Sequence, residues 1–368
     1  MKFRCERDIL VDALTTASRA VSSRGASLPI LNGLRLTLRG DELELTGSDL
    51  DLTISTKVVV SGVSDGQMVI PAKLATDIVK ALPAGAVEID AESDTASIGC
   101  GRSEFSVHLM PAAEFPHVNQ LNGSDDGVRS IVLQSAQFLD GLKQVTPAAS
   151  HDESRPVLTG VLLASEGTGL RLAATDSYRL SVRDLPGSSV LDEGQSVLVP
   201  SRAFSELTRI APADEISLLL GTKDATFDCG NVRLTTRLIE GDFPNYRGLI
   251  PSHQPNRLTI DRAALIEAVR RVRLMAREAT PVRLTMNEDS LELVAISQDV
   301  GQAHERLDAQ FTGDDLTVAF NPEYLLQGLE VTPGDEVSLE TVDSLKPALL
   351  RSTESSEFLY LLMPVRVS

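Results

Sequence analysis

The chain has 368 residues, and 42% of them are hydrophobic, which is enough apolar material for two or three folded domains. The amino-terminal sequence MKFRCERDIL is too charged for a secretory signal peptide, and no apolar run reaches the roughly 18 residues of a membrane span. We therefore expect a cytoplasmic protein that does not bind membranes. The net charge of −18 weighs at first against nucleic-acid binding, because DNA affinity depends chiefly on lysine and arginine contacts to phosphates.

A pattern of elements that occurs three times along the chain indicates its domain organisation. Each copy runs through a short strand and helix, an alternating strand, a strand that leads into a second helix, and a closing apolar strand. The landmarks are, in this order, Phe3, Ile131 and Leu258; Leu43, Leu170 and Leu291; Val69, Leu198 and Ala319; and Glu104, Val232 and Phe358. Because four landmarks in one order are hard to obtain by chance, we predict three copies of one domain.

Within each copy, the elements predict a mixed layer of helices and strands. In RLTLRGDELELTG, two alternating runs flank Gly40 and Asp41, where a hairpin turn is expected. Pro71 and Pro200 stand where a helix start tolerates proline, because the missing N–H would be unpaired there anyway. We predict the α+β class, with three repeated domains that each pack two helices on an antiparallel sheet.

The domain boundaries follow from the spacing of the copies. We place the three domains at residues 1–122, 129–252 and 257–368. The stretches NGSDDG and PSHQPN, at residues 122–127 and 251–256, are rich in turn formers and poor in apolar residues. Both stretches are therefore predicted to be linkers.

The sequence carries little that points to catalysis, a metal or a cofactor. The five histidines show no metal-ligand spacing, and the chain has no phosphate-binding glycine motif and no nucleophile elbow. Cys5, Cys100 and Cys229 are too few and too scattered for a zinc site or a disulfide framework. Cys100 and Cys229 occupy equivalent repeat positions, so we interpret them as small buried strand residues. We expect a protein without catalytic activity and without a cofactor.

Aspartates at one turn are the best candidates for acid and base chemistry. Asp49 and Asp51 lie in GSDLDL, and Asp176 lies in AATDSYRL. Asp49 and Asp176 are repeat equivalents, whereas the third copy has Ser297 at that position. A carboxylate that recurs at the same turn of two domains is more economically a structural turn residue than a catalytic one.

Positive charge gathers on one face of the helix predicted for residues 261–278. Arg270, Arg273 and Arg277 follow at spacings of three and four residues, so they share one side of this helix. The opposite side carries the apolar residues Leu265, Val269, Val272 and Ala276. Such a stripe is often only a solvated face. A basic lining can nevertheless coexist with an acidic exterior, because salt screens charges over about 8 Å.

Several segments together resemble the bacterial DNA sliding clamps, which are the beta subunits of DNA polymerase III. These segments are LPILNGLRL, GSDLDL, IPAKLATDIVKALP, LMPAAEFP, RPVLTGVLL, AATDSYRLSV, LIEGDFPNYRGLIP, FNPEYLLQGLE and YLLMPVR. The resemblance covers the whole chain and implies a head-to-tail homodimer, a closed six-domain ring with an inner wall of helices. It also implies a non-catalytic processivity factor that encircles duplex DNA without reading its sequence.

The resemblance further implies a cleft that binds short peptides of partner proteins. The implied partners are a clamp loader, the replicative DNA polymerase and repair proteins. The cleft positions transfer to Leu158, Thr175, Ser177, Tyr178, Arg179, Leu180, Pro244, Leu249, Leu361, Leu362, Met363, Pro364, Val365 and Arg366. Methionine and aliphatic side chains form an adaptable apolar pocket, and we expect Arg179 and Arg366 to bind peptide carbonyls or carboxylates at its rim. Without the resemblance, LLMPV would read as a last core strand.

The implied DNA and dimer contacts also map onto single residues. The predicted DNA-binding residues are Arg19, Arg24, Lys73, Lys80, Lys143, Arg202, Arg209, Arg270, Arg273 and Arg277. The dimer contact is expected between Phe105 and Val107, exposed on an edge strand, and the partner's residues at the positions of Leu274 and Met275. Lys73 or Arg102 facing Asp299 or Glu305 across this contact would add charge complementarity.

Two departures from the family pattern limit what the resemblance implies. Many relatives carry tyrosines just before the RPVL segment, whereas this chain has HDESRP at residues 151–156, so a contact of that loop with DNA does not transfer. Gly248 stands where relatives often have an arginine, which alters one rim of the cleft.

Two functions of other classes remain open from the sequence. One is an enzyme that uses Asp49 or Asp176, and the other is a three-domain scaffold that binds peptides without encircling DNA. Retention on circular DNA, with loss when the circle is cut, separates a ring from a scaffold. The sequence does not specify which partners bind or how a ring would open.

Overall fold

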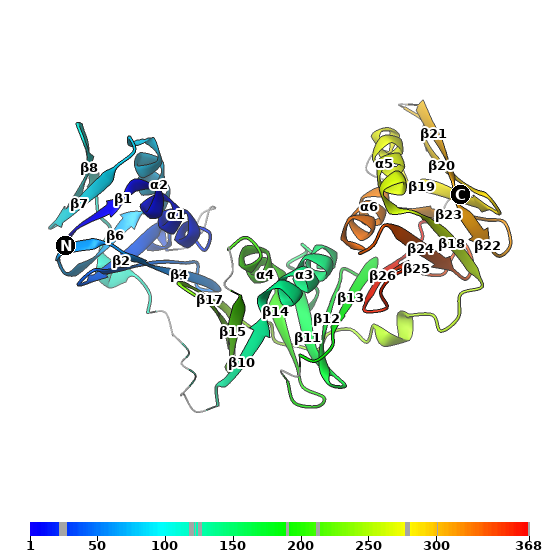
Figure 1. Ribbon diagram of the computed structural model, residues 1–368, viewed down its shortest axis with the longest axis horizontal. Helices are drawn as coiled ribbons and strands as arrows, with labels where there is room; N and C mark the ends of the chain where they lie inside the picture. Colours follow the sequence, from blue (N-terminus) through cyan, green and yellow to red (C-terminus); the bar gives the residue numbers. More distant parts are fainter. Residues whose placement is uncertain are drawn as a thin grey trace. The chain divides into compact units, whose positions relative to one another are not determined.

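The computed structural model describes residues 1–21, 28–117, 121, 123, 127–188, 191–210, 214–276, 280–299 and 301–366 (Figure 1). Their internal contacts divide the chain into two compact units. The first unit comprises Met1–Ala136 and Glu206–Leu238, and the second comprises Gln137–Ser205 and Ile239–Ser368. Each unit therefore combines one outer repeat with part of the middle repeat. No helix in the described part of the chain is long and apolar enough to cross a membrane.

The first unit contains a five-stranded and an eight-stranded sheet. In spatial order, the five-stranded sheet has β5 (Ser61–Ser64), β1 (Lys2–Glu6), β7 (Ala86–Glu92), β8 (Thr95–Cys100) and β9 (Ser103–His108). The eight-stranded sheet has β10 (Arg129–Gln134), β15 (Glu215–Leu220), β16 (Asp224–Cys229), β17 (Val232–Arg237), β4 (Leu52–Val59), β3 (Glu42–Ser48), β2 (Gly33–Arg39) and β6 (Gly66–Pro71).

The second unit contains a nine-stranded and a four-stranded sheet. The nine-stranded sheet has β14 (Ser196–Pro200), β11 (Gly160–Glu166), β12 (Gly169–Thr175), β13 (Arg179–Leu185), β26 (Phe358–Leu362), β25 (Ala348–Ser352), β24 (Glu336–Thr341), β18 (Asn256–Asp261) and β22 (Gln310–Thr312). The four-stranded sheet has β21 (Gly301–Asp308), β20 (Ser290–Ser297), β19 (Val282–Asn287) and β23 (Leu316–Phe320).

Two α-helices fall in each predicted repeat of the described chain. They are α1 (Arg7–Ser18) and α2 (Ala72–Ala81), α3 (Ser135–Val145) and α4 (Ser201–Leu207), and α5 (Arg262–Val272) and α6 (Pro322–Val331). Helix α1 packs on α2, and α5 packs on α6, as Figure 1 shows for both pairs. Every strand pair of the described residues is antiparallel, so the α+β class and the three repeated domains predicted from the sequence are confirmed.

Local sequence signals account for several element boundaries. The predicted hairpin joins β2 to β3 through Gly40 and Asp41, and Gly40 adopts a φ of 57°, which glycine tolerates without strain. Helix α6 begins after Asn321, whose side chain accepts hydrogen bonds from the N–H groups of Glu323 and Tyr324. The proline at its first position, Pro322, has no N–H that would need a partner.

The predicted basic helix is shorter than the sequence suggested. Helix α5 ends at Val272, and a 3-10 turn, η6 (Arg273–Met275), follows it. Leu265, Val269 and Val272 are buried as expected, but Ala276 lies beyond both elements and is only partly buried. The prediction from residue spacing fails here because it assumes an ideal α-helix. Spacing does not show where the backbone changes to the narrower 3-10 form.

Strand pairing continues from one repeat into the next, which the sequence did not predict. Strand β4 of the first repeat pairs with β17 of the second, from Leu52 opposite Thr236 to Thr56 opposite Val232. Strand β13 of the second repeat pairs with β26 of the third in the same manner. Each junction thereby satisfies the N–H and C=O groups of two strands that would otherwise be sheet edges.

The cores of the repeats are aliphatic with a few aromatic side chains. Phe138 of α3 and Phe204 of α4 meet edge to face, with ring centroids 6.0 Å apart. Cys100 and Cys229 are buried on β8 and β16, as predicted, and burial raises the pKa of the Cys229 thiol to about 12. A buried thiol with so high a pKa behaves as a small apolar residue.

We predict that Phe204→Ala destabilises the second unit by about 3–5 kcal/mol, because it removes a fully buried ring and leaves a cavity beside Phe138. Chemical denaturation followed by circular dichroism measures this loss as a lower denaturant concentration at the unfolding midpoint. Leu345→Ala, at a side chain that is 63% exposed, is the control and should leave the transition unchanged. Equal midpoints for Phe204→Ala and the unsubstituted chain would contradict the proposed core.

Candidate functional site

The junction between β13 and β26 brings most of the predicted cleft residues together in the second unit. Arg179 lies opposite Leu362 in this pairing, and Leu180 lies opposite Leu361. Successive side chains of a strand point to opposite faces of the sheet. The junction therefore has one face that carries Leu180 and Leu361, and another that carries Arg179 and Leu362.

Asp176 shapes the turn that leads into β13. Its Oδ1 atom accepts hydrogen bonds from the N–H groups of Tyr178, at 2.9 Å, and Arg179, at 3.0 Å. The Thr175 hydroxyl donates to the Arg179 carbonyl at 2.6 Å, and Ser177 adopts a φ of 81° between them. Asp49 accepts from the N–H groups two and three residues further on in the same way. These contacts support the interpretation of both aspartates as turn residues.

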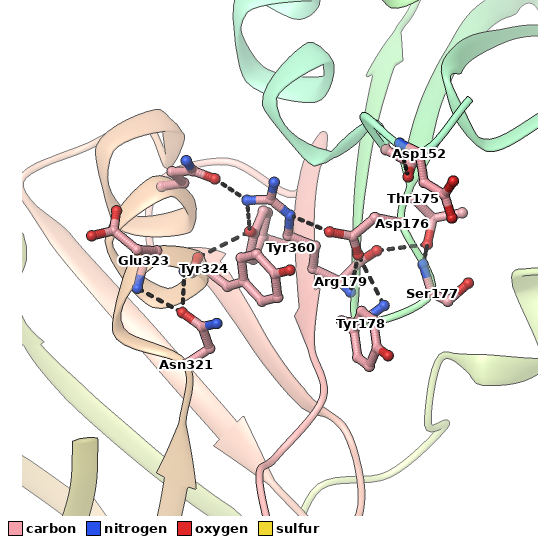
Figure 2. Close-up of polar contacts among 12 residues, drawn as sticks. Asp152, Thr175, Asp176, Ser177, Tyr178, Arg179, Asn321, Glu323, Tyr324 and Tyr360 are labelled. Carbon is pink, nitrogen blue, oxygen red and sulfur yellow. Dashed lines mark hydrogen bonds and ion pairs between the residues drawn. The ribbon is translucent and has the colours of Figure 1, made fainter. Parts of the chain in front are cut away.

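Arg179 is buried, which corrects the prediction that its guanidinium reaches a partner at the rim. Its side chain is only 5% exposed, and its Nε donates to Asp176 at 3.1 Å. Its Nη1 donates to Gln327 of α6 and, at 3.4 Å, to the hydroxyl of Tyr360. Figure 2 shows the guanidinium held between the Asp176 turn and α6. Arg179 therefore links the second repeat to the third, because it bonds to Asp176 in one and to Gln327 in the other.

Two tyrosines of the third repeat complete this polar network. The Arg179 guanidinium carbon lies 4.4 Å from the centre of the Tyr324 ring, in a cation–π contact. Tyr360 donates from its hydroxyl to the carbonyl of Tyr324 at 3.0 Å, and burial raises the pKa of Tyr360 to about 12. Gly328 lets α6 approach that ring, because a Cβ there would lie 2.6 Å from the Tyr360 ring atoms.

The opposite face of the junction is apolar and is covered by the segment of residues 239–250. Leu180, Val182, Leu359 and Leu361 belong to one buried cluster with side chains of β11, β12, β14 and β25. Ile239, Phe243, Tyr246 and Ile250 of the segment that follows β17 pack against this cluster. This segment includes the short turn η5 (Arg247–Leu249). Leu158 is also buried, so the predicted cleft leucines of the strands form a floor instead of an open surface.

Several of the other predicted cleft residues are accessible. Tyr178 is 59% exposed and stacks on Tyr324 with ring centroids 6.4 Å apart. Leu249 is 53% exposed, Met363 is 37% exposed, and Pro244 is also exposed. The N–H of Met363 donates to the Tyr178 carbonyl at 2.9 Å, which anchors the carboxyl-terminal segment beside the turn. An apolar rim of this kind suits a partner side chain better than a charged substrate.

The last residues of the cleft line a separate hollow of about 320 Å³. Val365 donates from its N–H to the Ala319 carbonyl at 2.8 Å, which continues the third repeat beyond β26. Arg366 is exposed and lines the hollow with Arg283, Val365 and Leu345. Arg366, unlike Arg179, is therefore available at the surface.

The predicted DNA-binding residues are mostly exposed, and several are ion-paired within the chain. Arg24 and Arg277 lie outside the described residues. Arg19 and Arg209 both contact Glu206, at 3.2 and 2.8 Å. In the third repeat, Arg270 contacts Glu267 and Glu330, and Arg273 contacts Glu323. Lys143 contacts Asp140 at 3.4 Å, whereas Lys73, Lys80 and Arg202 are exposed on α2 and α4.

The predicted dimer residues divide by burial. Leu274 is 74% exposed and Phe105 is 40% exposed, but Val107 is 4% exposed and packs into the first repeat's core. Val107 was predicted to be exposed, and this is wrong. The backbone of β9 forms the edge of its sheet, but the Val107 side chain packs into the core on one face of that sheet. Met275 is partly buried. Glu305 already contacts Arg271 of its own chain at 2.6 Å, which weakens the proposed charge pairing through it.

Sequence patterns missed the residues that hold Arg179. Gln327, Tyr324 and Tyr360 lie on α6 and β26, far from the turn along the chain. Tyr324 lies close to a feature that the sequence does show, the helix start at Asn321 and Pro322. Gln327 carries no local signal of this kind.

Models of one family match all three repeats. The DNA polymerase III beta subunit N-terminal domain matches residues 1–119, the central domain matches residues 132–245, and the C-terminal domain matches residues 247–366. A protein of Streptomyces coelicolor named "Beta sliding clamp" is 36% identical, and the alignment covers 100% of both chains. The chain belongs to the DNA polymerase III beta subunit family. A Synechocystis beta sliding clamp is 32% identical over 100% of both chains.

Solved structures of this family share the fold over the full length. The Bacillus subtilis DNA polymerase sliding clamp has a TM-score of 0.92 and 29% identity, and 100% of each chain is covered. The Bartonella birtlesii sliding clamp bound to griselimycin has a TM-score of 0.93 and 29% identity, again over 100% of each chain. The Pseudomonas aeruginosa clamp bound to the same compound has a TM-score of 0.91, 28% identity and the same coverage.

We predict that Asp176→Ala costs about 3–5 kcal/mol of stability, because it leaves the buried Arg179 cation without its carboxylate. Asp49→Ala is a matched control, since the same turn there leads to Leu52 instead of an arginine, and its loss should be near 1 kcal/mol. Urea denaturation of both variants measures the difference. Equal losses would show that the ion pair adds nothing beyond the turn.

Proposed function

We propose that two copies of this chain close into a ring around duplex DNA and act there as a processivity factor without catalytic activity. The observation that carries this function is the full-length match of three repeated domains to the sliding clamp family. A ring that encircles DNA stays bound through its topology and needs no contact with a specific base. A protein of this kind requires no active site, which agrees with aspartates that serve as turn residues.

The pairing of repeats inside the chain supports a third pairing between copies. The five-stranded sheet ends at β9, and the four-stranded sheet ends at β21, within the described residues. We propose that β9 of one copy meets the partner's third repeat, with Phe105 near the partner's Leu274 and Met275. A head-to-tail contact repeated twice closes if each step rotates by half a turn, and otherwise extends into a filament.

The basic residues on the helices are proposed to face DNA. These are Arg19, Arg24, Lys73, Lys80, Lys143, Arg202, Arg209, Arg270, Arg273 and Arg277. Arg270 and Arg273 contact Glu330 and Glu323 at the surface of the chain. Exposed ion pairs contribute only about 0–1 kcal/mol, so phosphates can displace the carboxylates at little cost. Their exchange keeps the contact weak and independent of sequence, as sliding requires.

The β13–β26 junction is the proposed docking site for partner peptides. Tyr178, Leu249 and Met363 are exposed, and we propose that they line this site above the buried Leu180 and Leu361. Two family members have been solved with griselimycin bound, which supports a ligand site on such clamps. The proposed partners are a clamp loader, the replicative DNA polymerase and repair proteins. The cell compartment proposed for all of them is the cytoplasm.

We predict that the chain loaded on nicked circular DNA is retained through gel filtration and is released when the circle is linearised. The double variant Leu274→Asp, Met275→Asp should be a folded monomer that is not retained, because buried charges at the contact oppose closure. Analytical ultracentrifugation gives its mass. A paired variant at an exposed apolar residue outside the contact, Val63→Asp, should remain a dimer.

Other outcomes would distinguish the alternatives. Equal release from circular and linear DNA would contradict encirclement and favour the peptide-binding scaffold. A dimer mass for the Leu274→Asp, Met275→Asp variant would remove these residues from the contact.

We predict that Met363→Ala weakens griselimycin binding about 5- to 30-fold without changing the dimer mass, because truncation of a central apolar contact typically costs 1–2 kcal/mol. Isothermal titration calorimetry measures the affinity. Ile296→Ala, an exposed residue of β20 outside the site, is the control and should bind like the unsubstituted chain. An unaltered affinity in Met363→Ala would exclude this residue from the cleft.

A further inference from the structure

The junction of the first two repeats reproduces the backbone of the β13–β26 junction. Asp49 shapes a turn into β4 as Asp176 does into β13, with Oδ1 accepting from the N–H groups of Asp51 at 3.1 Å and Leu52 at 2.8 Å. At the same place in both turns, a residue other than glycine adopts a positive φ, 83° at Leu50 and 81° at Ser177. Such strained residues gather at functional sites.

The strand register repeats as well. Leu52 lies opposite Thr236 and Thr53 opposite Thr235, where the other junction has Arg179 opposite Leu362 and Leu180 opposite Leu361. The residue after the pairing donates its N–H back to the turn in both cases. Arg237 donates to the Asp51 carbonyl at 3.0 Å, and Met363 donates to the Tyr178 carbonyl at 2.9 Å. One backbone frame is therefore present twice in the chain.

This frame encloses a hollow of about 300 Å³ in the first unit. Its lining residues are Ser48, Leu50, Asp51, Thr53, Pro116, His117, Asp224, Thr235, Thr236 and Arg237. All of them lie within Met1–Ala136 and Glu206–Leu238. The volume is at the lower end of ligand sites and suits one or two side chains of an extended peptide.

The side chains of this hollow differ from those of the peptide cleft in a consistent direction. Thr53 and Thr235 replace the floor residues Leu180 and Leu361, and Arg237 replaces Met363. The Thr53 hydroxyl pairs with the Ser48 hydroxyl at 2.8 Å and the Thr235 hydroxyl pairs with the Thr226 hydroxyl at 2.9 Å, so this floor lacks the large aliphatic side chains that an apolar partner residue would pack against. The frame at the first junction therefore selects another class of peptide.

The charges of the hollow favour a cation. Two carboxylates, of Asp51 and Asp224, line it against one guanidinium, of Arg237. Asp51 and Arg237 are only loosely paired at 3.9 Å, and their side chains are 76% and 65% exposed. Leu50, which is 47% exposed, and Pro116 offer apolar surface next to these carboxylates. A long side chain with an aliphatic stem and a charged end matches this combination.

We propose that the β4–β17 hollow is a second peptide-docking site, which takes an extended segment of a partner protein with a lysine or arginine at its centre. The stem of that residue packs on Leu50 and Pro116, and its charged end meets the carboxylates of Asp51 and Asp224. The acidic lining disfavours nucleic acid as the occupant, because phosphates would face like charge. The inference rests on the proposed function, in that the β13–β26 junction is taken as the peptide cleft.

The site is tested with a hexapeptide, acetyl-Gly-Ser-Lys-Ser-Gly-Ser-amide, and an otherwise identical peptide with norleucine in place of lysine. The dimer is labelled at leucine methyl groups, so that Leu50 reports on the hollow and Leu361 on the cleft in methyl NMR titrations. The lysine peptide should shift Leu50 saturably, with weaker binding at higher salt, and leave Leu361 unchanged. The norleucine peptide should shift neither.

Single substitutions then assign the charge. Asp51→Asn should weaken binding of the lysine peptide about two- to fivefold, as expected for one solvent-exposed ion pair, and Asp51→Lys should abolish it. Asp8→Asn, at a highly exposed carboxylate of α1 outside the hollow, is the matched control and should have no effect. Griselimycin added to the same samples should shift Leu361 in every variant, so a failed cleft is seen independently of a failed hollow.

The inference is overturned if the lysine peptide gives no saturable shift of Leu50 or if norleucine binds equally well. It is also overturned if Asp51→Asn and Asp8→Asn behave alike.

Discussion

The pairing of edge strands between repeats is the constraint on which the rest of the structure depends. A sheet edge exposes N–H and C=O groups that template pairing with another chain. In this protein, β4 pairs with β17 and β13 pairs with β26, so four of these edges are used inside the chain. Both proposed peptide-docking sites lie beside one of these pairings. The proposed closure between copies follows the same logic with the edges that remain.

The same turn prepares each pairing, and its neighbours decide what each junction can bind. Asp49 and Asp176 hold equivalent turns through the same pair of backbone hydrogen bonds. After the second turn stands Arg179, buried between the carboxylate and α6, whereas Leu52 stands after the first. A buried cation with partners on two repeats makes the second junction specific in geometry, because any other arrangement would leave its charge unpaired. The repeated turn and strand pairing therefore give both junctions the same backbone, and the side chains that differ decide what each junction can bind.

The acidic composition and the proposed DNA contact agree once the charges are placed. Arg270 and Arg273 contact Glu330 and Glu323 of α6. Such exposed pairs are weak, so they can be exchanged for phosphates without a large penalty.

The sequence by itself determined the three repeats, the α+β class, the buried cysteines and the structural role of the turn aspartates. These are local or periodic properties, which residue spacing records directly. It placed Leu180, Leu361 and Met363 at one site only through the family resemblance. Tertiary structure alone decided that Arg179 is buried, that Val107 points inward and that α5 ends at Val272. The burial of Arg179 depends on Gln327 and Tyr360, which are distant along the chain, and spacing within one segment carries no information about such partners.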